Sequence, residues 1–284
     1  MAAGAVDFRV RLPAELRPRM EAPPAEYVDQ YDAVLGLEAT RNKSLDDLIA
    51  EMDAAGVSHA VVHAEYEYGD PADEMNEAVG ALVKRMPDRF SGYGTVSLSP
   101  LRVMRAVEQV ARIAELGLRG VSMQPSFFGM AIDDGKLYPV YAKACELGLA
   151  VGLHTGINYT SHLPIKHDHP LQLDQVACDF PDLTLIACHA GWPWTAEMVA
   201  VARKHPRVYM EFGGLAPRYV ASPGTGWEVM FRFMNSLLSK QVLFGTDWPV
   251  FPMARALDEW RAAGLKPPVL DDLLSRNAAR LLGR

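Results

Sequence analysis

Cysteine is scarce in this chain, and clusters of lysine and arginine are absent. The three cysteines, Cys145, Cys178 and Cys188, have a spacing that fits neither a disulfide framework nor a zinc knuckle, so we expect them to be reduced. The formal net charge is −7. Nucleic-acid binding depends on clustered cations that displace counterions, so we expect no nucleic-acid partner.

Long apolar runs are also missing. No run approaches the length that is needed to cross a bilayer. Strand-like sequence begins at Ala5, which leaves no room for a basic segment followed by an apolar leader. We therefore expect no membrane partner and a cytoplasmic location. No linker rich in Ser, Gly or Pro divides the chain, so residues 1–284 are expected to form one domain.

The chain repeats one pattern, in which a helix-period segment stops at a glycine or a proline turn and passes into a β-branched run. Gly56, Gly117 and Gly148 mark three of these stops, because glycine takes the left-handed position that ends a helix. Ser44 and Asp47 offer an N-terminal cap for a helix over 45–55. Eight strands are expected, at about 5–12, 59–65, 91–98, 118–124, 150–155, 183–190, 207–213 and 242–248.

Eight strands that alternate with helices over about 250 residues are typical of a closed (β/α)₈ barrel. We therefore predict an α/β fold with a single TIM barrel. A doubly wound open sheet is the alternative, but no Gly-x-Gly-x-x-Gly follows an early strand. The segments 13–43 and 156–170 are long for loops that follow barrel strands, which is where such proteins build their sites.

Five polar residues lie at or near the carboxyl ends of expected strands: Arg9, Arg11, His154, His189 and Asp247. In a barrel these ends meet at one mouth, which is the catalytic face. The two arginines are two residues apart, so they are expected to point the same way. Cys188 precedes His189, so on a strand its side chain would point away from the face that His189 occupies.

Several short motifs, taken in order, resemble the amidohydrolase superfamily. They are Val6-Asp7-Phe8-Arg9-Val10-Arg11, Phe180-Pro181-Asp182-Leu183, Ala187-Cys188-His189-Ala190-Gly191, Phe244-Gly245-Thr246-Asp247-Trp248-Pro249 and Arg276-Asn277-Ala278-Ala279-Arg280-Leu281-Leu282. The resemblance is to the amidohydrolase-related branch, which includes aminocarboxymuconate-semialdehyde decarboxylase, γ-resorcylate decarboxylase and pyrone dicarboxylate lactonase. It covers nearly the whole chain.

The resemblance implies a role for three of the polar residues. His154 matches the metal ligand of the fifth strand, His189 the base or water activator of the sixth, and Asp247 the group of the eighth strand that binds metal and carries the proton. The His-x-His of the family's first strand is replaced by Arg9 and Arg11, which cannot coordinate a cation. We therefore expect no metal cofactor; the alternative is a divalent ion such as zinc on the three matching residues.

A hydrolytic mechanism follows from this exchange. Arg9 and Arg11 would hold a substrate carboxylate or polarise a carbonyl, since two guanidinium groups carry about the charge of Zn²⁺. Asp247 would act as the general base toward water, with His189 orienting the water and His154 bonded to the reacting oxygen. The family's lactonase is described as working without metal, which fits this scheme. The structural alternative is that the arginines simply pair with Asp247.

Further residues are candidates for the substrate pocket. Glu65 and Gln124 end the second and fourth strands, and Trp192 and Trp248 follow the sixth and eighth, where they would wall a planar substrate or cap the core. His63 and Glu211 are candidates for the same face. The histidines of one loop, His162, His167 and His169, have a spacing that fits no standard metal site.

Three functions are compatible with these residues. The first is a hydrolase, metal-independent, that acts on a small carboxylate-bearing or lactone-like substrate. The second is a non-oxidative decarboxylase of an aromatic or unsaturated acid. The third is a barrel that binds a small organic acid without catalysis, although a decayed site would have little reason to keep three costly polar residues. Barrels of this kind often self-associate, so a homo-oligomer is an open expectation.

Overall fold

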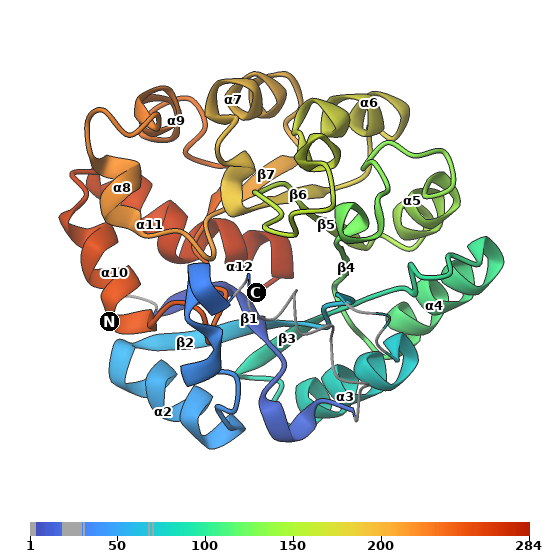
Figure 1. Ribbon diagram of the computed structural model, residues 1–284. Helices are drawn as coiled ribbons and strands as arrows, with labels where there is room; N and C mark the ends of the chain where they lie inside the picture. The colour runs from blue at the N-terminus through green and yellow to red at the C-terminus, as the bar shows by residue number, and fades with distance from the viewer. Residues whose placement is uncertain (1–3, 19–29, 31, 68, 70) are drawn as a thin grey trace.

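Eight parallel strands alternate with helices around one barrel in the computed structural model, which describes residues 4–18, 30, 32–67, 69 and 71–284 (Figure 1). Part of the long segment 13–43 therefore lies outside the described residues. Each strand pairs with the next in chain order, as predicted. The strands are β1 (Ala5–Arg11), β2 (Val57–His63), β3 (Phe90–Gly94), β4 (Gly120–Met123), β5 (Ala150–His154), β6 (Leu185–Cys188), β7 (Val208–Glu211) and β8 (Val242–Leu243).

The barrel closes where the chain beyond β8 meets β1. The amide N–H of Phe8 donates to the carbonyl of Phe244 at 2.8 Å, and that of Arg11 to the carbonyl of Trp248 at 2.8 Å. The amide of Asp247 donates back to the carbonyl of Arg9 at 2.9 Å. These bonds tie the expected eighth strand to the first, although only Val242–Leu243 keeps regular strand geometry. The predicted TIM barrel is confirmed.

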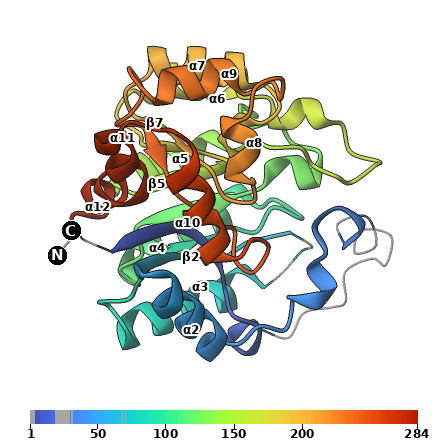
Figure 2. The same cartoon turned by 90° about the vertical axis from the view of Figure 1, so that its left-hand side faces the viewer.

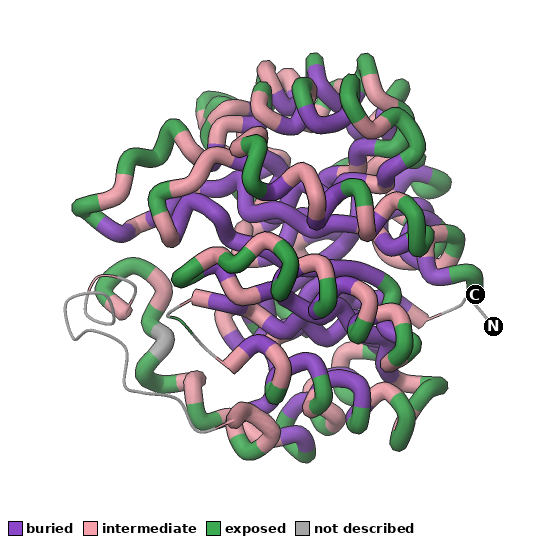
Figure 3. Tube along the Cα trace, turned by 90° about the vertical axis from the view of Figure 1, so that its right-hand side faces the viewer, coloured by how far each residue is buried: buried purple, intermediate pink, exposed green. Residues whose placement is uncertain are grey.

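Helices surround the strands and present exposed residues to the outside, while the strands are buried (Figure 3). They are α2 (Leu45–Ala55), α3 (Ala72–Arg85), α4 (Val103–Glu115), α5 (Tyr138–Glu146), α6 (Leu171–Asp179), α7 (Thr195–Lys204), α8 (Pro217–Ala221), α9 (Glu228–Met234), α10 (Met253–Ala262), α11 (Pro267–Asp271) and α12 (Asn277–Leu282). The predicted cap is present, because Ser44 and Asp47 form a reciprocal capping box at the start of α2. Gly56 ends that helix with φ of 75°.

The barrel interior is filled by its own small cluster of apolar side chains below the mouth. Phe8, Val61, Tyr93, Ile186 and Leu243 belong to this cluster, and Ala278 and Leu282 of α12 complete it. The carboxyl terminus lies at this end of the barrel, opposite the loop 156–170 (Figure 2). Within the described ranges, no helix has the length and apolar character that would span a membrane.

Candidate active site

The carboxyl ends of the strands surround a narrow pocket of about 60 Å³. Seven of the residues proposed from the sequence lie in its wall: Arg9, Arg11, Gln124, His154, His189, Trp192 and Asp247. Residues that sequence reasoning missed complete the wall, namely Leu35, Glu67, Phe127, Gly156, Ile157, Tyr159, Gly214, Leu215 and Val250. The fold therefore brings the predicted residues of five different strands to one place, as the carboxyl ends of a barrel should.

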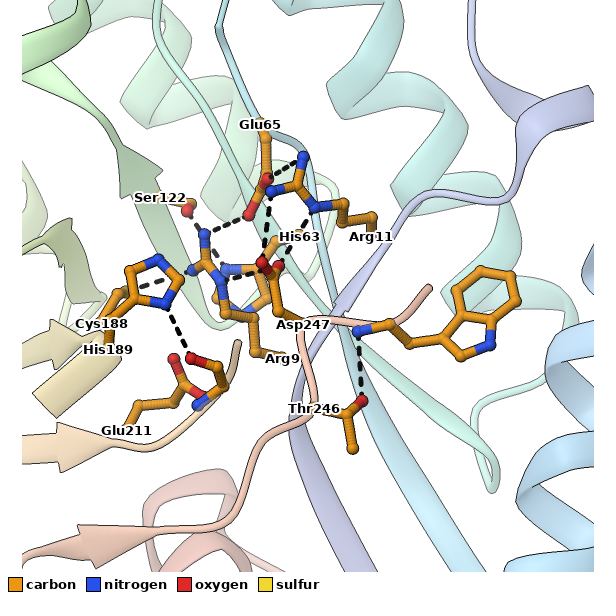
Figure 4. Close-up of polar contacts among 12 residues, drawn as sticks. Arg9, Arg11, His63, Glu65, Ser122, Cys188, His189, Glu211, Thr246 and Asp247 are labelled. Atoms are coloured by element: carbon orange, nitrogen blue, oxygen red, sulfur yellow. Dashed lines mark hydrogen bonds and ion pairs between the residues drawn. The ribbon is translucent and has the colours of Figure 1, made fainter. Parts of the chain in front are cut away.

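The two arginines are engaged by carboxylates on both sides (Figure 4). Nε of Arg9 donates to Asp247 Oδ1 at 3.2 Å, and its Nη2 bonds Glu65. Nε of Arg11 donates to Asp247 Oδ1 at 3.1 Å and its Nη2 to Asp247 Oδ2 at 3.3 Å, while its Nη1 bonds Glu67 at 3.0 Å. The pairing with Asp247, which the sequence left as the structural alternative, is thus present for both arginines.

These ion pairs change what Asp247 can do. Burial alone would raise the pKa of Asp247, but the adjacent charges of Arg11 and Arg9 outweigh it and hold that pKa well below its usual range. A carboxylate that is stabilised in this way is a weak base. The role of Asp247 as the general base stays a prediction, and in this geometry its carboxylate pairs with the two guanidinium groups.

The two arginines and the carboxylates that contact them do not give the pocket a net positive charge. Arg9 and Arg11 contribute two cations, whereas three carboxylates contact them, those of Glu65, Glu67 and Asp247. Arg9 is almost completely buried, with 1% of its surface exposed. Arg11 keeps 19% of its side chain exposed. A direct contact between these arginines and a substrate stays a prediction, and Arg11 is the better placed of the two.

The site does not have the donor set of a divalent metal centre. First-strand ligands are missing, because Arg9 and Arg11 have no lone pair to offer. Asp247 already accepts three hydrogen bonds from those arginines. In the part of the chain that the structure describes, His154, His189 and Asp247 do not form a group whose ligand atoms all lie within 4.8 Å of one another. Repulsion between a divalent ion and a guanidinium about 4 Å away would amount to several kcal/mol at an effective dielectric of 20.

His154 is held by a carboxylate that the sequence analysis did not identify. Its Nδ1 lies 2.6 Å from Oδ1 of Asp168, which is fully buried. In a neutral imidazole, a hydrogen bond from Nδ1 to the carboxylate of Asp168 leaves the lone pair on Nε2. Within the described ranges, Nε2 has no hydrogen-bond partner. Asp168 belongs to the loop 156–170, whose length indicates a place where site residues lie. Within this loop the sequence analysis considered the histidines and not Asp168.

His189 is set in an unusual backbone conformation at the end of β6. Its φ is 62°, and Ala190 and Asp247 have φ of 49° and 56°; these are the non-glycine residues with positive φ in the described ranges. Such conformations are costly and cluster at functional sites. Nδ1 of His189 lies 2.7 Å from the carbonyl oxygen of Gly213, so this nitrogen is the donor. Burial, together with the nearby His154 and Arg9, lowers the pKa of His189 to about 3, so its ring is neutral.

The condition for the predicted orientation of Cys188, that it and His189 both lie on a strand, is not met. The Sγ of Cys188 accepts a hydrogen bond from Nη1 of Arg9 at 3.2 Å. Strand alternation does not apply between Cys188 and His189, because β6 ends at Cys188 and His189 is left-handed. Burial raises the pKa of the thiol to about 12, so it remains protonated.

Two proposed substrate-binding residues are not in the pocket wall. Trp248 is fully buried, and its ring packs in the core between barrel and helices rather than facing the pocket. Glu65 lies behind Arg9 and Arg11, which separate it from the pocket. His63 is also internal, because its Nε2 lies 2.9 Å from the carbonyl oxygen of Phe8. The strand positions place all three residues near the carboxyl end of the barrel. They do not distinguish residues that line the pocket from residues that are buried behind its wall.

Glu211 gives a prediction for the pH dependence of stability. Burial raises its pKa to about 8, against which the charge of Arg9 acts only partly. Between the ordinary pKa of 4.5 and this raised value, the folded protein binds a proton at Glu211 that the unfolded chain releases. The contribution of this proton to the free energy of unfolding is full below about pH 4.5 and is lost as the pH rises through about 8. Relative to wild type, Glu211→Gln should gain a few kcal/mol of unfolding free energy between pH 5 and 9, at about 1.4 kcal/mol per pKa unit.

Urea unfolding of both proteins at several pH values measures this difference. The comparison with the variant is needed because Asp7, whose pKa burial raises to about 7, titrates in the same window. Glu146→Gln, on the exposed surface of α5, is the matched control and should follow wild type at every pH. A constant difference between wild type and Glu211→Gln would contradict the prediction.

Comparison with known proteins identifies the family of this chain. The family model described as amidohydrolase matches residues 6–284. The chain belongs to the amidohydrolase family. A curated relative, 2-amino-3-carboxymuconate-6-semialdehyde decarboxylase of Dictyostelium discoideum, is 25% identical over 245 residues, which cover 75% of this chain and 67% of the relative.

Solved structures share the barrel. An uncharacterised TIM-barrel protein of Bordetella bronchiseptica is 29% identical, with a TM-score of 0.81 over 99% of both chains. Two structures of lower identity show the fold alone. A probable 2-pyrone-4,6-dicarboxylic acid hydrolase of Acinetobacter baumannii is 14% identical, with a TM-score of 0.68 over 99% of this chain and 100% of its own. A 5-carboxyvanillate decarboxylase of Novosphingobium aromaticivorans, complexed with manganese, is 16% identical, with a TM-score of 0.70 over 99% of this chain and 95% of its own.

Proposed function

We propose that this amidohydrolase-family protein is a hydrolase of an uncharged lactone or similarly activated ester, and that it works without a divalent metal. The observation that supports it most is the pairing of His154, a residue of the pocket wall, with the buried Asp168, with 2.6 Å between Oδ1 and Nδ1. A histidine held by a buried carboxylate is the usual general base of acyl-transfer sites. It takes the place of Asp247, which is fixed between two arginines.

The reaction starts at Nε2 of His154, to which no described residue bonds. Nε2 accepts a proton from a water molecule, and the water oxygen forms a bond to the acyl carbon while the carbonyl electrons move to oxygen. Among the described residues, Arg11 donates three hydrogen bonds to Asp247 and Glu67, and its Nη1 lies 3.2 Å from Oε2 of Glu65. A second N–H of Nη2 is available for this oxyanion. The intermediate then collapses, the bond to the leaving oxygen breaks, and His154 returns its proton to that oxygen. A lactone gives one hydroxy acid.

The charge balance favours this reaction over decarboxylation. A decarboxylase must bind an anionic carboxylate, but three carboxylates already surround the two arginines. A substrate anion would therefore meet a pocket without excess positive charge. For the same reason, of the carboxylate-bearing and lactone-like substrates that the sequence allowed, we favour the lactone.

Decarboxylation of an aromatic or unsaturated acid is the second candidate. The name of the Dictyostelium discoideum relative and that of the Novosphingobium aromaticivorans structure support it as well as the pyrone hydrolase supports hydrolysis. Two assays separate the reactions: acid release from γ-lactones and dihydrocoumarin, and carbon dioxide release from a panel of phenolic acids. Carbon dioxide release without lactone opening would overturn the hydrolase proposal. Tight binding of either class without turnover would favour the third candidate, a non-catalytic barrel.

Metal dependence gives a separate prediction. Because Arg9 and Arg11 occupy the positions of the family's first-strand ligands, purified protein should carry no stoichiometric zinc or manganese at this site, and chelation should leave its activity unchanged. Elemental analysis of the protein and assays before and after dialysis against EDTA measure both. The 5-carboxyvanillate decarboxylase with the same fold is complexed with manganese, and similarity to it would instead favour a bound metal. One bound equivalent of metal per chain whose removal abolishes activity would contradict the proposal.

A further inference from the structure

The small pocket opens into a larger cavity, here called the outer chamber, of about 640 Å³. Its wall contains Val34, Leu35, Tyr159, Trp192, Gly214, Leu215, Ala216, Tyr219, Val220, Thr225, Trp227, Val250, Phe251 and Arg255. Leu35, Tyr159, Trp192, Gly214, Leu215 and Val250 belong to the walls of both cavities. The two spaces are therefore continuous, and α8 and α10, which lie side by side, carry the outer part of the wall (Figure 2).

The chemistry of the chamber is apolar. Among the described residues of its wall, the charged one is Arg255, whose Nε donates to Glu259 at 2.8 Å and whose guanidinium lies 4.6 Å from the ring centre of Phe251. The carboxylate of Glu259 already balances the charge of Arg255, so this residue gives no reason to expect an anionic ligand. Large apolar side chains are nevertheless left open here, with 52% of Tyr219 and 53% of Val34 exposed. Exposed apolar surface that borders a catalytic pocket is typical of a ligand site.

We propose that the outer chamber binds an uncharged alkyl or aryl group of the substrate, attached to the acyl group that reacts in the inner pocket. This inference rests on the proposed hydrolase function and adds the substrate class. The inner volume, about 60 Å³, accommodates little more than the reacting group, whereas the chamber is about ten times larger. An apolar group passing between Trp192 and Leu215 would enter it directly, because both side chains border the two cavities.

The size of the effect follows from burial of methylene groups. Each buried CH₂ contributes about 0.8 kcal/mol, which corresponds to about a fourfold change in affinity. Because the apolar group is bound equally in the ground and transition states, this contribution should lower KM and leave kcat nearly constant.

A homologous series tests the proposal. γ-Lactones with side chains from methyl to octyl are assayed for kcat and KM, and the matching γ-lactams, which resist hydrolysis, are titrated by calorimetry. KM and the lactam Kd should both fall by about fourfold per CH₂ until the chamber is filled. Values that do not change with chain length would overturn the proposal. Lactams that bind with this dependence, while no lactone is opened, would support the chamber and overturn the hydrolase function instead.

Variants assign the effect to the chamber wall. Tyr219→Asp places a charge on the rim of the chamber and should remove the dependence of KM on chain length. Leu171→Asp is the matched control, because Leu171 is also 52% exposed but lies outside the chamber, and it should behave as wild type. Ala216→Trp, which fills the chamber from a second position, should act like Tyr219→Asp. If the chain-length dependence is absent and sedimentation shows that Tyr219→Asp dissociates a dimer, the chamber holds a second copy of the chain and the proposal is overturned.

Discussion

Replacing Asp168 by asparagine is expected to lower kcat by about 10³-fold to 10⁴-fold, the loss typical of an imidazole that is held in the wrong tautomer. The amide of asparagine can donate to Nδ1 of His154, which would move the ring proton to Nε2. Nε2 then has no lone pair with which to accept a proton from water. Because the pocket wall is unchanged, KM should stay close to that of wild type.

The structure offers a matched control for this change. Asp174 lies 2.6 Å from Nε2 of His205, the same distance as in the Asp168–His154 pair, but on the outside of the barrel. Asp174→Asn should therefore leave kcat unchanged. His154→Ala should be as inactive as Asp168→Asn and should recover part of its activity in added imidazole, which can enter the vacated space. Equal activity of Asp168→Asn and wild type would exclude His154 as the general base.

Replacing Arg9 by methionine is expected to lower the free energy of unfolding by about 3–5 kcal/mol, as is typical when one partner of a buried ion pair is removed. Glu65 and Asp247, with 6% and 3% of their side chains exposed, would lose one of the two arginines that pair with both of them. Chemical denaturation of the purified variant measures the loss. Arg11→Met should cost less, because its side chain is partly exposed to water, which screens the charges that remain.

Two further variants separate the charge effect from the loss of packing. Arg276→Met removes an arginine whose ion pair with Asp271 is exposed on both sides, and it should change stability little. Arg9→Met combined with Glu65→Gln should recover part of the loss of Arg9→Met, because one of the carboxylates that lost this partner is then neutral. If the double variant is less stable than Arg9→Met alone, the loss comes from packing and the electrostatic account is wrong.

The arginines at the first-strand positions thus have a structural consequence for the rest of the site. Asp247, which the family resemblance assigned to metal binding and proton transfer, becomes the anion that anchors two guanidinium groups. Proton transfer passes, in our proposal, to His154 and the carboxylate behind it. The expected cytoplasmic location and homo-oligomer remain predictions.

The sequence predicted the barrel because the relevant signals are local. Glycine stops such as Gly56, the Ser44 cap and the alternation of β-branched runs with helical periods depend on residues that are near one another in the chain. Because the carboxyl ends of barrel strands must meet, it also predicted that Arg9, His154 and Asp247 share one mouth.

Only the tertiary structure decided how these residues are used. Arg9 bonds Glu65 and Asp247, which are 56 and 238 positions away, and no local pattern reveals which carboxylate reaches which guanidinium. Asp168 lies in an irregular loop, where side-chain direction follows no period, so its bond to His154 was not predictable. The sequence determined which residues reach the mouth; their protonation states and roles were decided by burial and long-range charge, which exist only after the chain has folded.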